Sequence, residues 1–163
     1  MKLFGVLSDT HGSASAIDAA LDRLSGVDAF IHLGDLVSDA EHIASRTGKP
    51  VHAVRGNCDV FSSAKGQYGT ELVLEEEGVR ILLVHGHAHE VDAYSTYAAR
   101  LRALELGCGA LFYGHTHIPQ LVQRDGLILL NPGSPSRPRG GSRPSCALAE
   151  LDGGVLRARV TAL

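Results

Sequence analysis

The stretch "KLFGVLSDTHGSASAIDAALDRLSGVDAFIHLGD" (residues 2–35) decides the architecture of the chain. Residues 2–8 form a nearly continuous apolar run, which is typical of a strand buried on both faces. Apolar residues recur at helical spacing over residues 13–24, and a second apolar run follows over residues 28–34. A strand, a helix and a strand in this order predict two parallel strands joined by a right-handed crossover.

The following elements continue the alternation of strand and helix, and the later ones are mostly hairpins. The sequence predicts a helix over 39–48, a strand over 51–56, hairpins over 70–86, 119–131 and 145–163, a helix over 91–107 and a strand over 110–114. Early βαβ units followed by late hairpins imply a mixed α/β architecture, and two packed sheets with helices outside would account for both. Because no repeat or linker interrupts the chain, we expect one domain over residues 1–163.

Polar residues of the metal-binding types follow five of the predicted strands. In α/β sheets, ligands bind beyond the carboxyl ends of the strands, so these side chains should converge on one rim. In an extended chain, residues two apart point to the same side, which would pair Asp9 with His11 and His115 with His117. The converging set is Asp9, His11, Asp35, Asn57, His85, His115 and His117.

Seven carboxylate, amide and imidazole groups exceed the needs of one metal ion. A mononuclear catalytic zinc uses about three protein ligands, whereas a two-metal site needs more. Mixed oxygen and nitrogen ligands suit Mn, Fe, Zn, Co or Ni. Each histidine alone is more often an ordinary core or surface residue, and "GD" and "GN" are common turns. Their coincidence at five strand ends favours a metal centre.

Composition excludes several other classes of protein. A chain of 163 residues with 44% hydrophobic and 20% charged residues is globular, and its net charge of −3 argues against an extended nucleic-acid surface. Three widely spaced cysteines indicate a reducing compartment rather than a disulfide framework. No window approaches the roughly 18 apolar residues of a membrane span, and the N-terminus lacks a signal-peptide pattern. We therefore expect a cytoplasmic protein that does not contact membranes.

Five short blocks resemble, in order, the signature blocks of the calcineurin-like metallophosphoesterases, in particular the small prokaryotic phosphodiesterases of the YfcE type. The resemblance implies a four-layer αββα sandwich of two mixed β-sheets with flanking helices. The segment "NPGSPSRPR" (131–139) is also similar to this subgroup. The blocks are "DTHG" (9–12), "GDLV" (34–37), "GNCD" (56–59), "VHGHAHE" (84–90) and "GHTH" (114–117).

The resemblance also implies a dinuclear centre and its chemistry. Asp9, His11 and His117 would hold one divalent ion and Asn57, His85 and His115 a second, with Asp35 bridging the two ions. Mn²⁺ is the expected metal, with Ni²⁺, Co²⁺, Fe²⁺ or Zn²⁺ as alternatives. Metal-activated water would hydrolyse a small phosphate ester. Asn57 would also contact the substrate phosphate.

The block "GNCD" departs from the "GNH[DE]" of many members, in which a histidine held by the acidic residue protonates the leaving group. Cys58 replaces that histidine and precedes Asp59. A thiol could donate a proton, but nearby metals would lower its pKa, and the alternative interpretation of Cys58 is a small apolar filler. Without a strong acid, esters with good leaving groups should react fastest, which favours activated diesters.

Three further residues are candidates for substrate contacts. His87 could contact the substrate or donate a proton, and otherwise lies in a solvated loop. Arg137 and Arg139 could hold a phosphate in bidentate fashion, or could lie in a flexible loop. His32, His42 and His52 are interpreted as structural or surface residues.

Two alternative functions remain open. One is a phosphomonoesterase, such as a nucleotidase, at the same site. The other is a non-catalytic scaffold of the same fold, as in a retromer subunit whose metal site is degraded. The complete set of seven ligand candidates favours the enzyme. Apolar residues in "VDAYSTYAARL" (91–101) could support a homo-oligomer.

Overall fold

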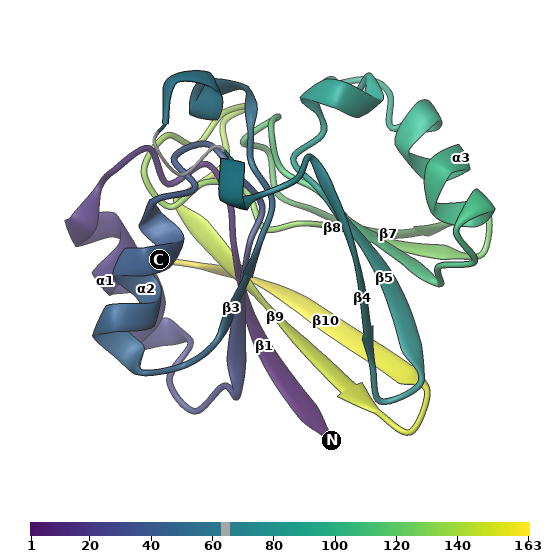
Figure 1. Cartoon of the computed structure of the whole chain (residues 1–163), viewed down its shortest axis with the longest axis horizontal. Coiled ribbons are helices and arrows are strands. Elements are labelled where there is room, and N and C mark those ends of the chain that lie inside the picture. Colours follow the sequence, from purple (N-terminus) through teal and green to yellow (C-terminus); the bar gives the residue numbers. More distant parts are fainter. Residues whose placement is uncertain (63–65) are drawn as a thin grey trace.

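The computed structural model describes residues 1–62 and 66–163, which form two five-stranded sheets packed face to face (Figure 1). The first sheet contains, in spatial order, β10 (Val155–Ala162), β9 (Ser145–Asp152), β1 (Lys2–Leu7), β2 (Ala29–His32) and β3 (Val51–Ala53). The second contains β4 (Glu71–Glu76), β5 (Val79–Val84), β6 (Ala110–Phe112), β8 (Leu127–Asn131) and β7 (Gln120–Arg124). The inner strands β1–β2–β3 and β5–β6–β8 run parallel, and the hairpin strands pair antiparallel, so both sheets are mixed.

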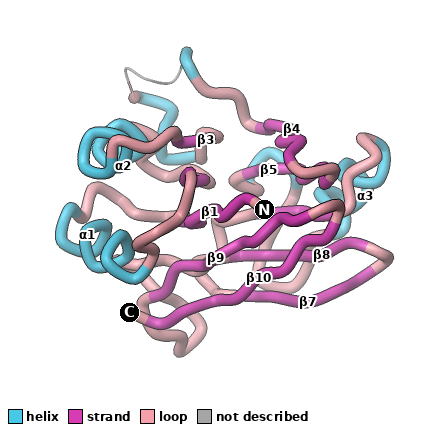
Figure 2. The backbone as a smooth tube through the Cα atoms, turned by 90° about the horizontal axis from the view of Figure 1, so that it is seen from below, coloured by secondary structure: helices cyan, strands magenta, loops and turns pink. Residues whose placement is uncertain are grey.

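Helices cover the outer face of each sheet. α1 (Ala14–Arg23) and α2 (Asp39–Thr47) lie against the first sheet, and α3 (Tyr97–Glu105) lies against the second (Figure 1). Two short 3-10 helices, η1 (Asn57–Phe61) and η3 (His87–His89), follow β3 and β5. This arrangement confirms the four-layer αββα sandwich. Seen from below, the edge strands β7 and β10 of the two sheets lie side by side (Figure 2).

Alternating burial explains the continuous apolar runs of the sequence. On β5, Ile81 and Leu83 belong to the core between the two sheets, whereas Leu82 and Val84 belong to the core under α3. Both faces of the strand are therefore packed, which removes the polar alternation of a half-exposed strand. The same packing fixes the carboxyl ends of the parallel strands at one edge of the sandwich.

The three predicted hairpins are confirmed, and their turns contain residues with positive φ. The turns at Glu77–Gly78 and Asp125–Gly126 have φ values of 51° and 77° and of 53° and 80°, which suit two-residue hairpin loops. The prediction of a helix over residues 91–107 is wrong at its start, because α3 begins at Tyr97. The carboxylate of Asp92 accepts hydrogen bonds from the backbone N–H groups of Tyr94 and Ser95, and this local turn replaces the first helical turns.

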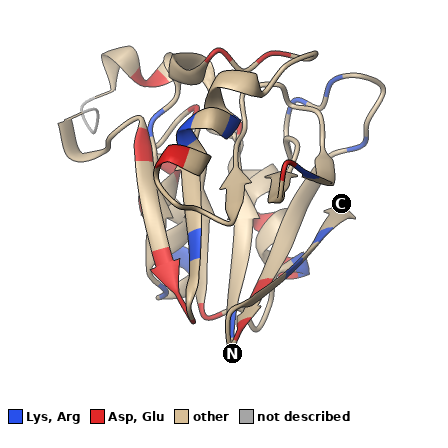
Figure 3. Ribbon diagram, turned by 90° about the vertical axis from the view of Figure 1, so that its right-hand side faces the viewer, with Lys and Arg blue, Asp and Glu red and all other residues tan. Residues whose placement is uncertain are grey.

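Charged residues of both signs are interspersed over the molecule rather than collected on one face (Figure 3). Within residues 1–62 and 66–163, no helix combines the length and the hydropathy that a membrane span requires.

Phe112 tests the core between the sheets. Its side chain is fully buried there, so Phe112→Ala should lower the free energy of unfolding by roughly 3–5 kcal/mol. The matched control is Phe61→Ala, because Phe61 is 98% exposed and its removal should change the free energy by less than about 0.5 kcal/mol. Guanidinium unfolding in the presence of a chelator measures both. Equal effects of the two substitutions would contradict this packing.

Candidate metal centre

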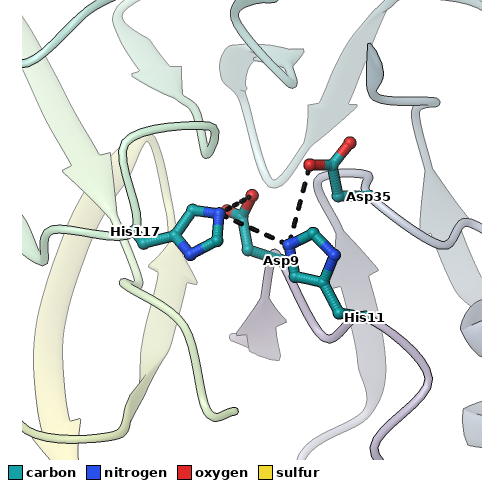
Figure 4. A group of neighbouring side chains, drawn as sticks. All are labelled: Asp9, His11, Asp35 and His117. Atoms are coloured by element: carbon teal, nitrogen blue, oxygen red, sulfur yellow. Dashed lines mark hydrogen bonds and ion pairs between the residues drawn. The ribbon is translucent and has the colours of Figure 1, made fainter. Parts of the chain in front are cut away.

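Four of the predicted ligands meet at the carboxyl ends of three strands. Asp9 and His11 follow β1, Asp35 follows β2, and His117 follows β6. One oxygen or nitrogen atom of each lies within 4.8 Å of the corresponding atoms of the others (Figure 4). Residues 106 positions apart, His11 and His117, thereby bring their Nε2 atoms to 3.4 Å from each other.

The other three predicted ligands, Asn57, His85 and His115, lie next to this group. His85 Nε2 lies 3.1 Å from Asn57 Oδ1 and 3.4 Å from Asp35 Oδ1. The ring of His115 lies 5.1 Å from the ring of His85, measured between centroids. The structure therefore brings all seven residues into one region.

Asp35 lies between the two groups. Its Oδ2 is 3.7 Å from His11 Nε2, and its Oδ1 is 3.4 Å from His85 Nε2. The side chain is nearly fully buried, and its Oδ1 also accepts a hydrogen bond of 2.9 Å from the backbone N–H of Cys58. One carboxylate thus presents a different oxygen to each group of imidazoles.

The hydrogen bonds of two histidines fix which nitrogen faces the centre. His85 Nδ1 lies 2.8 Å from the carbonyl oxygen of Leu33, and His117 Nδ1 lies 2.6 Å from that of Arg137. A carbonyl oxygen only accepts, so each Nδ1 carries the hydrogen and each Nε2 turns toward the carboxylates. Metal-binding histidines commonly show this arrangement, in which a backbone carbonyl orients the ring.

Asp9 gives the most direct indication that the residues fit a cation. The residue is fully buried, and its Oδ2 accepts hydrogen bonds from Ser8 Oγ and from the backbone N–H of His115. Its Oδ1 accepts none from the residues that the structure describes, although it lies 3.2 Å from His117 Nε2. A buried acceptor without a donor costs about 1–3 kcal/mol. A divalent ion held by Asp9 Oδ1 and the facing imidazole nitrogens would remove that cost.

The shifts in pKa favour an ionised Asp9 and neutral rings of His11 and His115, whereas His117 differs. Burial raises the pKa of Asp9, but His117 and His85 outweigh burial and hold the pKa below its ordinary value. Burial lowers the pKa of His11 and that of His115. For His117, burial lowers the pKa, but the Asp9 carboxylate outweighs burial and raises it, so a proton competes with a metal ion there.

The backbone of the ligand residues differs from the prediction. The expectation of extended chain at these pairs is wrong, because five ligands adopt the left-handed conformation. Such φ values are uncommon outside glycine and are tolerated best by Asp, Asn and His. The chain leaves each strand in a tight turn, which aims successive side chains inward. The φ values are 55° for Asp9, 47° for His11, 59° for Asp35, 67° for His115 and 59° for His117.

Asp59 holds one of these turns rather than facing a substrate. Its buried carboxylate oxygens accept hydrogen bonds from four backbone N–H groups, those of Gly56, Asp35, Leu36 and Val37, at 2.6–3.2 Å. The resemblance implied that Asp59 supports the acid that protonates the leaving group. In the structure its carboxylate is committed to the backbone, so it positions Asp35.

Cys58 is exposed, so its interpretation as an apolar filler is wrong. Partial desolvation and the neighbouring Asp35 carboxylate raise the pKa of the thiol to about 11 in the metal-free chain. The thiol is therefore protonated at neutral pH, but it is a weak acid.

The structure places the other predicted residues near the centre. The ring of His87 lies 5.4 Å from that of His85, and its buried Nδ1 has no hydrogen-bond partner in residues 1–62 and 66–163. The loop that carries Arg137 and Arg139 packs against His117, because the backbone N–H of Arg139 donates to the His117 carbonyl oxygen.

Arg55 is a cation near the centre that the sequence pattern did not predict. Burial lowers the pKa of His87, and Arg55 adds to this effect from the end of β3. The only signal for Arg55 in the sequence was its place directly before "GN".

Comparisons with known proteins agree with the geometry. The model of the calcineurin-like phosphoesterase superfamily domain matches residues 1–154. A probable metallophosphoesterase of Methanothermobacter thermautotrophicus is 37% identical over 165 residues, which cover 97% of this chain and 91% of that protein. The phosphodiesterase YfcE of Escherichia coli K12 is 31% identical over 174 residues, covering 93% of this chain and 89% of that protein.

Solved structures share the fold. A predicted phosphoesterase of Streptococcus pneumoniae superposes with a TM-score of 0.79 at 28% identity, covering 99% of this chain and 89% of that one. Vps29 of Entamoeba histolytica in complex with Zn²⁺ has a TM-score of 0.74 at 23% identity, covering 98% of each chain. At that identity the likeness concerns the fold alone.

Gly114 tests the close approach of the two sheets at Asp9. A Cβ atom at this position would lie 1.9 Å from Ser8 Oγ and 2.8 Å from Asp9 Oδ2. Gly114→Ala should therefore displace Asp9 and weaken Mn²⁺ binding by about 10–100-fold, as loss of a supporting contact at a metal site does. Titration of chelator-treated protein, followed by electron paramagnetic resonance, measures the affinity. Gly109→Ala is the control, because a Cβ there meets nothing within 4 Å. Unchanged affinity in Gly114→Ala would show that Asp9 does not hold metal.

Proposed function

The chain belongs to the calcineurin-like phosphoesterase superfamily, and from this premise we propose that it hydrolyses phosphate diesters at a centre that holds two divalent metal ions. The observation that carries the proposal is the carboxylate of Asp35, whose two oxygens face His11 on one side and His85 on the other. A carboxylate in this position suits a ligand shared by two ions.

We assign the ligands by the sides of Asp35 on which they lie. Asp9, His11 and His117 would hold one ion, and Asn57, His85 and His115 the second. Short distances support the first group, whose atoms lie within 4.8 Å of one another together with those of Asp35. The contact of 3.1 Å between His85 and Asn57 supports the second. Oxygen and nitrogen ligands without thiolate suit Mn²⁺, and also Ni²⁺, Co²⁺, Fe²⁺ or Zn²⁺.

Bound divalent ions supply positive charge for the phosphoryl oxygens and make water a nucleophile near neutral pH. The protein contributes further positive charge around them. Arg137 and Arg139 lie on the loop against His117, and Arg55 acts on His87 on the other side. These guanidinium groups suit an anionic substrate and can pair with its oxygens in bidentate fashion. The amide of Asn57 and the ring of His87 would contact the same phosphate.

The preference for diesters rests on the leaving group. Burial and Asp35 raise the pKa of Cys58 to about 11, bound ions would instead favour its thiolate, and the Asp59 carboxylate accepts hydrogen bonds from backbone N–H groups. Neither residue is suited to protonating a poor leaving group, so esters of acidic alcohols or phenols should react fastest. The name of the relative YfcE as a phosphodiesterase supports the same class of substrate.

A phosphomonoesterase is the second candidate function, because three arginines near the centre would also suit the dianion of a monoester. A scaffold function is less well supported, since the ligand residues are complete and converge. Vps29 shares the fold, but fold alone does not decide function.

We also propose a single domain, a cytoplasmic location and a capacity to self-associate. The family model matches residues 1–154, and all three cysteines are free, as in a reducing compartment. Tyr94 and Tyr97 are 97% and 61% exposed at the start of α3, where a second copy could pack.

Two substitutions test the centre. Asp35→Asn and His115→Ala should each lower Mn²⁺-dependent hydrolysis of bis-p-nitrophenyl phosphate by at least about 100-fold, because each removes a proposed ligand. The control is His42→Ala, since His42 is a surface histidine beside Asp18 and should leave the rate unchanged. If the folded wild-type protein neither turns over with Mn²⁺, Ni²⁺, Co²⁺ or Zn²⁺ nor binds them, the enzyme is ruled out and the scaffold remains.

Two substrates with one leaving group separate the two enzyme functions. For bis-p-nitrophenyl phosphate and p-nitrophenyl phosphate, kcat/KM should be at least about 10-fold higher for the diester, and the ratio reports differential stabilisation of the transition states. A ratio inverted in favour of the monoester would establish the phosphomonoesterase instead.

A further inference from the structure

Three buried side chains next to the ligand loops form a hydrogen-bonded relay. Thr10 Oγ1 lies 2.8 Å from His32 Nε2 and 2.6 Å from Asp39 Oδ2. Thr10 and His32 are fully buried, and Asp39 is 8% exposed. None of the three is a proposed metal ligand, although Thr10 stands between two of them.

The direction of every hydrogen bond in the relay is determined. The backbone N–H of Gly34 lies 3.3 Å from His32 Nδ1, and because an amide nitrogen only donates, Nδ1 must be the accepting nitrogen. Nε2 then carries the hydrogen and donates it to Thr10 Oγ1. The Thr10 hydroxyl donates in turn to Asp39 Oδ2, which also accepts from the backbone N–H of Gly12 at 2.9 Å.

The relay joins the segments that carry three ligands. Thr10, in the middle of the relay, lies on the loop after β1 between Asp9 and His11, and His32, at one end, is the last residue of β2, shortly before Asp35. Two backbone hydrogen bonds join the same two segments, from Asp9 N–H to the Gly34 carbonyl at 3.0 Å and from His11 N–H to the Asp35 carbonyl at 3.3 Å. Asp39 attaches the same segments to the first turn of α2.

The backbone at these ligands needs such support. Asp9, His11 and Asp35 have φ values of 55°, 47° and 59°, and left-handed residues other than glycine persist only where the surroundings hold them. The Thr10 hydroxyl sits between the first two, where it accepts from His32 and donates to Asp39. Removing it would leave the His32 donor without its acceptor and remove one of the two hydrogen bonds that Asp39 Oδ2 accepts from this loop.

We propose that Thr10 is a positioning residue, whose relay to His32 and Asp39 sets the places of Asp9, His11 and Asp35 and thereby the metal affinity of the centre. The inference rests on the proposed metal centre. Its effect is on ion binding rather than on contact with substrate.

The test compares two substitutions of Thr10. Thr10→Val keeps the shape and removes the hydroxyl, whereas Thr10→Ser keeps the hydroxyl. Chelator-treated protein is titrated with Mn²⁺, and bound ion is followed by electron paramagnetic resonance. We expect affinity to fall about 10–100-fold in Thr10→Val and by less than about 3-fold in Thr10→Ser. At saturating Mn²⁺, the KM for bis-p-nitrophenyl phosphate should stay at the wild-type value.

The matched control is Thr47→Val, which removes a hydroxyl that bonds the Ile43 carbonyl in the last turn of α2. It makes the same chemical change away from the relay and should leave Mn²⁺ affinity unchanged. Should Thr10→Val fail to fold by circular dichroism, Asp39→Ala removes the acceptor at the other end of the relay, and the same loss of affinity is expected.

The outcomes separate the relay from the metal centre. Wild-type Mn²⁺ affinity in folded Thr10→Val, or in folded Asp39→Ala where Thr10→Val does not fold, would overturn the relay alone. An equal loss of affinity in Thr10→Ser and Thr10→Val would also overturn it, because the hydroxyl would not be the cause. A wild-type protein that binds no Mn²⁺ would overturn the metal centre, and the relay with it.

Discussion

Side chains that present lone pairs crowd one buried point, and a bound cation would stabilise this arrangement. Asp9 Oδ1 has no hydrogen-bond donor in the described part of the chain, and the Nε2 atoms of His11 and His117 lie 3.4 Å apart. The sandwich makes the crowding unavoidable, because parallel strands buried on both faces end at the same edge. The packed core supplies rigidity, and the loops at that edge supply the ligands.

Hydrogen bonds to the backbone offset the strain of the left-handed conformation at these residues. Asp59 accepts four N–H groups around the turn of Asp35. Ser134 and Ser136 donate to the carbonyl oxygen of Asp9 from the loop that also orients His117. Each anchor comes from a segment distant in sequence, so the geometry of the centre depends on the whole sandwich. Such anchoring is how residues with left-handed backbone persist at functional sites.

The sequence was sufficient for the parts that depend on local pattern. Apolar runs marked the strands, "DG" and "EEG" marked hairpins, and the residues after the strands marked the ligands. It was insufficient where a distant hydrogen bond decides the outcome. The left-handed backbone at Asp9 and the hydrogen bonds that Asp59 accepts from N–H groups 22 and 24 residues away follow from tertiary contacts that no periodicity carries. The late start of α3 could have been predicted from local sequence, since Asp92 is a residue type that favours turns.

The candidate ligands come from both sheets. Asp9 and Asp35 follow strands of the first, whereas His85 and His117 follow strands of the second. Ions held at this edge would cross-link the two sheets of the sandwich. The folded chain would then be stabilised by about 2.7 kcal/mol for each ion present at a hundredfold excess over its Kd. Metal supply in the cell would thus govern how long the protein survives as well as how fast it works.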